Sequence, residues 1–138
     1  MSERDNTSIV KGIYDTFLKG DIPGLVDSFH DDIEWHLPEI ENVPYSGSIK
    51  GRSNVEKFFQ TLAEDQQVVN FDPREFIASG DRVVVLGDYT WHVIPTDKDF
   101  SGNWVHVWTV KEGKAVSFRE YTDTYAVSIA HQKSMAAL

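Results

Sequence analysis

The sequence predicts an α+β fold in which helices precede a run of mainly antiparallel strands. The first half carries apolar residues at helical spacing, and the second half carries alternating segments joined by short turns. The length of 138 residues, 41% of them hydrophobic, suits one core. We therefore expect one domain over residues 1–138. Its sheet, antiparallel or mixed, should curve into a cone with the N-terminal helices enclosing one pocket.

The predicted elements begin with two helices and a short strand. Apolar residues recur at helical spacing over residues 9–18, and Gly20 is expected to end that helix. Asp21 can cap a short second helix. Residues 33–37 have the pattern of a strand, which Pro38 stops.

The third helix is expected after a loop over residues 39–52. Ser53 and Glu56 form an S-x-x-E pattern, which is typical of a capping box at a helix start. The apolar residues of this helix that should be buried are Val55, Phe58, Phe59 and Leu62.

The second half is expected to form four successive strands and a final helix. Turn residues separate the strands, which should cover 68–78, 82–94, 101–111 and 115–122. Pro73 interrupts the first of them. Glu112 and Gly113 form the turn of the last hairpin, and Asp123 can cap a short helix after it.

The bulk composition restricts the partners. A formal net charge of -9 disfavours nucleic acid and anionic membranes. There are no cysteines, and the polar N-terminus lacks a signal-like apolar segment. Phosphate-loop and dinucleotide-binding glycine motifs are missing, so no cofactor is expected. We expect a cytoplasmic protein.

The last hairpin carries the residues most suited to chemistry. Alternation places Trp104, His106 and Trp108 on one face of their strand, and Phe118 and Glu120 on one face of the next. An imidazole and a carboxylate could thus reach one cavity, and these are the groups of a general acid–base pair. A purely structural pair that tightens the hairpin is the alternative.

Four segments resemble SnoaL-like proteins, and in particular the small proteins related to ketosteroid isomerase within the nuclear transport factor 2-like superfamily. They read GIYDTFLKGDIPGLVDSFHDDIEW, VPYSGSIKGRSNVEKFF, SGDRVVVLG and WVHVWTVKEGKAVSFREYTDT. The resemblance implies the cone-shaped fold and a homodimer formed through the sheet. In similar polyketide cyclases a pocket histidine and an acid lie on the last two strands, where His106 and Glu120 stand here; the cyclase acid is Asp rather than Glu.

The resemblance does not extend to the steroid isomerase mechanism. The base of those enzymes falls near Leu37, their tyrosine falls at Ile13 with Tyr14 one residue away, and their second acid falls at His106. Epoxide hydrolysis is also weakened, because Trp104 and His106 replace the Arg-x-Asp partner strand of limonene epoxide hydrolases.

Further candidates depend on which way a side chain points. His36 is a third catalytic candidate if it faces the pocket, but alternation lets only one of Trp35 and His36 do so. The expected substrate-binding residues are aromatic apart from one acid: Tyr14, Phe17, Trp35, Phe59, Asp88, Trp104, Trp108 and Phe118. Asp88 can equally face solvent. A metal site made by His36, His106 and Glu120 lacks a supporting local motif, and no metal is expected. His30, His92 and His131 are expected at the surface.

Two functions remain open at this point. The first is a cofactor-independent enzyme, of isomerase, cyclase or dehydratase type, that acts on a hydrophobic carbonyl-containing small molecule with Glu120 and His106 as acid–base pair. The second is a non-catalytic module of the same fold that binds a hydrophobic ligand or dimerises. Whether the protein is an enzyme, and on which substrate, is not decided by the sequence.

Overall fold

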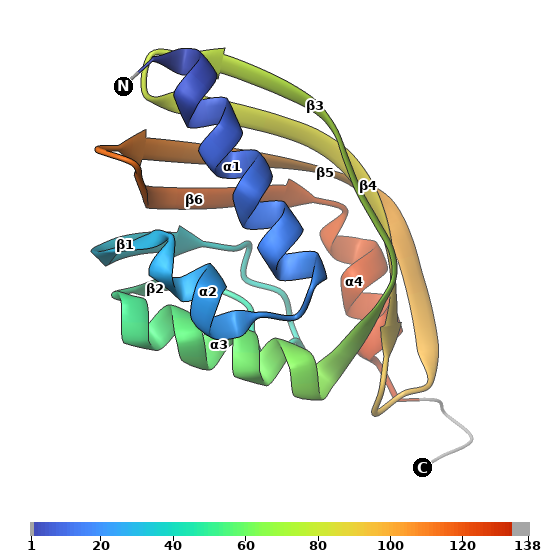
Figure 1. Ribbon diagram of the computed structural model, residues 1–138. Helices are drawn as coiled ribbons and strands as arrows, with labels where there is room; N and C mark the ends of the chain where they lie inside the picture. Colours follow the sequence, from blue (N-terminus) through green and yellow to red (C-terminus); the bar gives the residue numbers. More distant parts are fainter. Residues whose placement is uncertain (1, 134–138) are drawn as a thin grey trace.

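A computed structural model describes residues 2–133 and shows a strongly curved sheet with helices packed inside the curve (Figure 1). The helices are α1 (Glu3–Leu18), α2 (Ile22–Asp27), α3 (Arg52–Asp65) and α4 (Thr124–His131). The strands are β1 (Phe29–His36), β2 (Ser48–Lys50), β3 (Gln66–Ser79), β4 (Arg82–Val93), β5 (Lys98–Lys111) and β6 (Lys114–Thr122). The predicted α+β class is confirmed.

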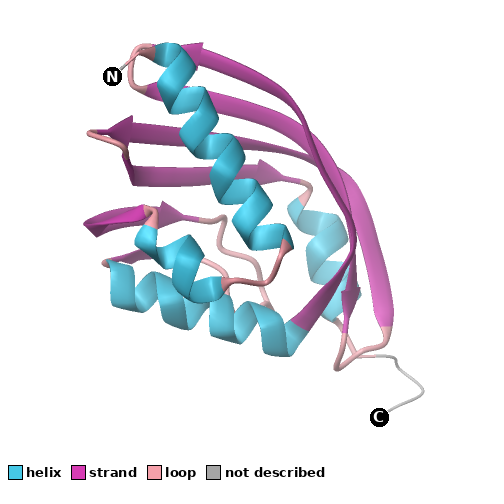
Figure 2. Cartoon of the chain, viewed as in Figure 1, coloured by secondary structure: helices cyan, strands magenta, loops and turns pink. Residues whose placement is uncertain are grey.

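The six strands form one mixed sheet in the order β2-β1-β6-β5-β4-β3. All neighbours are antiparallel except β1 and β6, which run parallel. Figure 2 shows α1 lying across the concave face, with α2 and α3 closing the end near β1 and β2. Residues far apart in the chain therefore face one another across the inside of the curve.

Two helix starts differ from the sequence prediction, that of α3 and that of α1, which begins at Glu3 with Ser2 as its N-cap rather than near residue 9. Asp21 accepts a hydrogen bond from Gly24 N, and Asp123 accepts one from Ala126 N, as expected for N-caps. The capping box proposed for α3 is wrong, because α3 begins at Arg52 after Gly51 with no side-chain cap.

Gly51 explains that difference. Its φ of +95° lies in the region that favours glycine, and its N–H donates to Ile33 O at 2.8 Å. The chain thus turns into α3 directly from the edge of the sheet.

The first two strands differ most from expectation. β1 begins four residues earlier than predicted, and its register against β6 is irregular between Phe29 and Glu34. The exposed acidic residues in that interval hide the strand pattern. β2 lies within the predicted loop over residues 39–52 and pairs with β1 through three residues only, so it is too short for alternation to reveal.

The long strands determine which side chains point toward the site. On β4 and β5, buried and half-buried residues alternate, so one face of the sheet points into the core. β3 is an edge strand, and its register shifts between Pro73 and Glu75. Glu112 and Gly113 both have positive φ at the β5–β6 turn, which confirms the predicted hairpin.

Over residues 2–133, none of the helices has the length and apolar character needed to cross a lipid bilayer.

Candidate functional site

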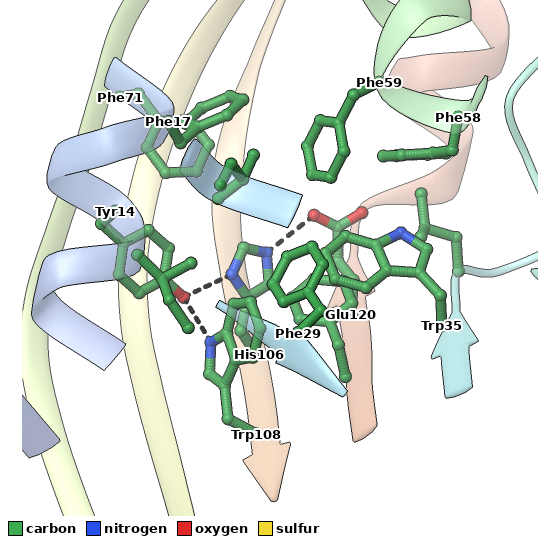
Figure 3. A pocket seen from close by; sticks show the side chains of 14 residues that line it. Tyr14, Phe17, Phe29, Trp35, Phe58, Phe59, Phe71, His106, Trp108 and Glu120 are labelled. Atoms are coloured by element: carbon green, nitrogen blue, oxygen red, sulfur yellow. Dashed lines mark hydrogen bonds and ion pairs between the residues drawn. The ribbon is translucent and has the colours of Figure 1, made fainter. Parts of the chain in front are cut away.

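A cavity lies between the concave face of the sheet and helices α1, α2 and α3. Its free volume is about 70 Å³, several times what one water molecule needs. Its walls are mainly aromatic: Phe17, Phe29, Trp35, Phe58, Phe59, Phe71, Trp108 and Phe118. Tyr14, His106 and Glu120 bring polar atoms to this lining (Figure 3).

A chain of hydrogen bonds runs through one wall of the cavity. Trp108 Nε1 donates to Tyr14 Oη at 2.9 Å, and Tyr14 Oη lies 2.7 Å from His106 Nδ1. His106 Nε2 lies 2.9 Å from Glu120 Oε2. Figure 3 shows these side chains in a row that ends at the carboxylate. Three elements, α1, β5 and β6, contribute to the row.

The donors and acceptors fix the direction of this chain. Trp108 Nε1 can only donate, so the hydroxyl proton of Tyr14 is free to go to His106 Nδ1. Nδ1 is then the acceptor, and Nε2 carries the proton that it donates to the Glu120 carboxylate. If Nδ1 carried a proton, it would donate to Tyr14 Oη, and the Tyr14 proton would then have no acceptor within this network. The network therefore selects a neutral His106 that carries its proton on Nε2 and donates it to Glu120 Oε2.

Burial also favours the neutral form of His106. His106 is 4% exposed, and burial lowers its pKa, while the hydrogen bond and charge of Glu120 partly oppose that shift. Burial also raises the pKa of Tyr14 well above its usual value; the Trp108 hydrogen bond lowers it, and the Glu120 charge raises it further. Burial thus favours the neutral forms of both side chains.

Glu120 is the member of this row best placed to meet a ligand. Its side chain is 16% exposed, against 6% for His106. Its Oε2 atom is held by His106, so the other carboxylate oxygen is available to a bound molecule. A fixed carboxylate with one free oxygen in an apolar cavity can take a proton from a ligand and return it.

Trp35 adds an unused hydrogen-bond donor to the same cavity. It is 4% exposed, its ring stacks on Phe118 with centroids 4.0 Å apart, and its Nε1 has no hydrogen-bond partner. Figure 3 shows Trp35 beside Phe58 and on the same side of the cavity as Glu120. A buried donor without a partner is costly, and a ligand acceptor would satisfy it.

Trp104 supports the histidine from behind. Its ring stacks on that of His106 with centroids 4.0 Å apart, and it is 1% exposed. The indole occupies space that a side chain at Gly87 would fill: a Cβ there would lie 2.4 Å from Trp104 Cζ2. Gly87 and Trp104 are direct partners across β4 and β5. The absent side chain therefore makes room for the ring that holds His106.

The structure brings most of the predicted site residues together. Those that line the cavity are Tyr14, Phe17, Trp35, Phe59, His106, Trp108, Phe118 and Glu120. The predicted pairing of the last two strands places His106 directly opposite Glu120.

Three predicted site residues lie elsewhere. His36 is wrong as a pocket residue: Trp35 pairs with inward-facing Phe118, so His36 points away and its Nδ1 lies 3.0 Å from Ser48 Oγ. Asp88 lies on the outer face of β4, in an ion pair with Arg74 at 3.1 Å. Trp104 is not part of the cavity wall.

The prediction that His131 lies at the surface is also wrong. His131 and Asp65 are 8% and 7% exposed, and His131 Nε2 lies 2.7 Å from Asp65 Oδ2. His131 Nδ1 donates to the carbonyl oxygen of Val127 at 2.8 Å. Because that oxygen only accepts, a second proton must be shared by Nε2 and the carboxylate. This pair attaches α4 to the end of α3.

Six residues that line the cavity were not predicted from the sequence as pocket residues: Ile13, Leu25, Phe29, Leu37, Phe58 and Phe71. Phe58 was expected in the core, and Phe71 lies on the edge strand before the shift at Pro73. Helical periodicity identifies Phe58 as buried but cannot say whether it faces a cavity.

Among residues 2–133, no group of three or more metal-ligating side chains is arranged to hold an ion. His36 lies outside the cavity that contains His106 and Glu120, so the three do not form one site.

The fold agrees with comparisons to known families. A family model for the SnoaL-like domain matches residues 10–118, and the chain belongs to this family. No curated protein sequence shows significant similarity to it.

Solved structures give the same assignment. An NTF2-like protein from Burkholderia xenovorans LB400 is 35% identical, with a TM-score of 0.86 over 96% of this chain and 99% of that one. TerC, co-crystallised with polyporic acid, is 29% identical, with a TM-score of 0.77 over 92% and 98% of the two chains. A Mesorhizobium loti protein provisionally named a SnoaL-like polyketide cyclase is 21% identical, with a TM-score of 0.69 over 83% and 96%, and supports the fold alone.

Proposed function

We propose that this protein is a cofactor-independent acid–base enzyme, of isomerase, cyclase or dehydratase type, acting on a hydrophobic carbonyl-containing small molecule. The observation that carries the proposal is the directed hydrogen-bond row from Trp108 through Tyr14 and His106 to Glu120. It ends on a carboxylate in an apolar cavity. A row that only stabilised the hairpin would not need its charged end at the cavity.

Glu120 is the proposed acid and base. Its free oxygen takes a proton from the carbon next to the substrate carbonyl, and the electron pair moves onto the carbonyl oxygen to give an enolate. The resulting acid returns the proton to a second carbon in an isomerisation, or to a leaving hydroxyl in a dehydration. His106 positions the carboxylate and donates to it throughout, because its Nε2 proton points at Oε2.

Trp35 is the proposed donor to the carbonyl oxygen. Trp35 lines the cavity and its buried Nε1 has no partner, whereas the hydroxyl proton of Tyr14 is used by His106. A donor already in place where negative charge develops stabilises the transition state. The surrounding aromatic rings exclude water and strengthen this interaction.

The relative crystallised with polyporic acid supports a small organic ligand for this cavity. At 29% identity it covers nearly the whole chain, so we propose a ligand of comparable chemical kind without assigning that compound as the substrate.

Proton exchange tests the proposed reaction without knowledge of the full substrate. A panel of aryl ketones is incubated with the protein in D₂O, and deuterium incorporation next to the carbonyl is followed by NMR. We expect catalysed exchange for at least one ketone and a loss of about 100-fold or more in Glu120→Gln. Glu56→Gln, at an exposed position on α3, is the matched control and should keep the wild-type rate. Exchange that survives Glu120→Gln would refute the assignment.

The alternative is a binding module with the same cavity. The mainly aromatic lining favours it. It predicts that ligands bind wild type and Glu120→Gln with affinities within about threefold while no exchange is catalysed. Isothermal titration with polyporic acid, run beside the exchange assay, separates the two.

We also propose a homodimer through the outer face of the sheet. Two rows of paired side chains cross this face, Ile77–Val84–Val107 and Leu86–Val105–Tyr121. Ile77 and Tyr121 are 56% and 55% exposed, and such a continuous apolar surface favours association. Analytical ultracentrifugation should give a dimer for wild type and a monomer for Val107→Asp; a wild-type monomer at micromolar concentration would contradict the proposal.

A further inference from the structure

A second cavity lies on the other side of Glu120. It is bounded by residues from the loop after β1, from β3 to β6 and from α4, and its free volume is about 50 Å³. Leu37, Phe71 and Glu120 line both this cavity and the aromatic one. The catalytic candidate thus stands between two adjoining chambers rather than at the end of one.

The second chamber contains a buried carboxamide with one unused end. Gln66 is 4% exposed, and its Oε1 has no hydrogen-bond partner. Tyr45 also lines this chamber. If the amide is turned over, its nitrogen takes the place of the oxygen that has no partner. Either orientation leaves one polar atom of Gln66 without a partner.

Two hydroxyls of the chamber, those of Tyr89 and Thr122, are already paired. Tyr89 Oη and Thr122 Oγ1 are hydrogen-bonded to each other, and Thr122 Oγ1 donates to Asn103 O at 3.2 Å. Tyr89 therefore provides the proton that Thr122 accepts. Gln66 therefore has a buried polar atom that a hydrogen bond from a ligand would satisfy.

We propose that the second chamber is a substrate subsite in which Gln66 binds a hydroxyl group. A hydroxyl both donates and accepts, so it satisfies the free end of the carboxamide in either orientation. The substrate class is then an arene joined by a short arm to a hydroxyl: the ring lies in the aromatic chamber, the arm passes Glu120, and the hydroxyl reaches Gln66. This deepens the proposed function, since it places the reacting part of the molecule beside Glu120.

Matched probes test the subsite by binding alone. The affinity of 4-phenyl-1-butanol is compared with those of butylbenzene and the methyl ether of the alcohol, by titration followed through tryptophan fluorescence. Wild type should bind the alcohol about three- to tenfold more tightly than butylbenzene, as expected for one buried neutral hydrogen bond. In Gln66→Met, which keeps the length of the side chain, that preference should disappear. Gln67→Met, at the neighbouring exposed position, should keep it.

Several outcomes would overturn the subsite. They are equal affinities of wild type for alcohol and hydrocarbon, no binding of any of the three probes, and a preference that persists in folded Gln66→Met. A preference lost in Glu120→Gln but kept in Gln66→Met would also refute it, because the hydroxyl would then lie on Glu120. If Gln66→Met does not give a folded circular dichroism spectrum, Gln66→Leu replaces it, and the wild-type comparison stands without either. Since no turnover is measured, failure here is separate from failure of the proton-exchange assay.

Discussion

The hydroxyl oxygen of Tyr14 lies 2.7 Å from Nδ1 of His106 and joins helix α1 to the strand that carries the candidate site. The same oxygen accepts from Trp108 Nε1, so its single proton has one possible destination. This contact, 92 residues apart in sequence, decides which nitrogen of His106 carries the proton.

Tyr14→Phe should slow proton exchange by about 10- to 100-fold, the range typical of groups that orient a functional side chain. His106 Nδ1 would lose its donor, and its tautomer would no longer be fixed. The binding of butylbenzene should change little, because the aromatic ring remains. Tyr125→Phe, whose native side chain is 74% exposed, serves as the control and should match wild type in both assays. An unchanged exchange rate in Tyr14→Phe would show that the row does not position Glu120.

Stability should depend on pH through His106. Burial lowers its pKa in the folded protein below the 6.5 of the free side chain. Between those two values the unfolded chain binds more protons, so the free energy of unfolding rises with pH through this window and falls on acidification below about 6.5. Urea unfolding from pH 7.5 to 5 should show a steeper loss for wild type than for His106→Gln.

The exposed His30 provides the control for that experiment. His30→Gln should follow the wild-type slope, since it leaves His106, Tyr14 and Glu120 in place. Identical slopes for wild type and His106→Gln would contradict a lowered pKa at His106.

Gly87→Ala should destabilise the fold by about 1–3 kcal/mol, the usual cost of forcing extra volume into a packed core. The added methyl would meet Trp104 and the backbone oxygen of Asp72, both at 2.4 Å. Displacing Trp104 would disturb His106, so proton exchange should fall as well.

Gly12→Ala is the opposite case on helix α1. A Cβ at Gly12 meets nothing within 4 Å, and alanine should stabilise the helix by about 0.5–1 kcal/mol. Thermal and urea unfolding of both variants gives the comparison. If Gly87→Ala left the free energy of unfolding unchanged, Trp104 would have room to move and would not hold His106.

Asp65→Ala should lower the free energy of unfolding by about 3–5 kcal/mol, because it leaves buried His131 without the partner of its Nε2 atom. Glu64→Ala, the exposed neighbour on the same helix, should stay within about 0.5 kcal/mol of wild type. Urea unfolding measures both. A small effect at Asp65 would mean that α4 is not held by this pair.

The sequence was sufficient to predict the last hairpin and to identify its two key residues. Its turn at Glu112 and Gly113 fixes the register, and alternation then places His106 and Glu120 on one face. Nothing in the local pattern could decide between Trp35 and His36, because a strand offers both faces. The parallel pairing of β1 with β6, which places Trp35 beside Phe118, made that choice.

Other parts of the site depend on contacts that no local pattern encodes. Strand alternation places Trp104 on the same face of β5 as His106. Trp104 nevertheless packs behind the histidine, because Gly87 leaves space there. Gln66 stands at the junction of α3 and β3, where helical and strand periodicity both end. The chamber that it lines is bounded by residues of the loop after β1 and of α4, which are brought together only by the fold.

The protonation state of His106 tests the central claim most directly. ¹⁵N NMR of the wild-type protein, with the imidazole assigned through His106→Gln, reports which ring nitrogen carries the proton at pH 7. We predict a neutral ring with the proton on Nε2 and an unprotonated Nδ1 that accepts from Tyr14. A proton on Nδ1, in either the other neutral tautomer or the imidazolium, would contradict the directed row that ends on Glu120.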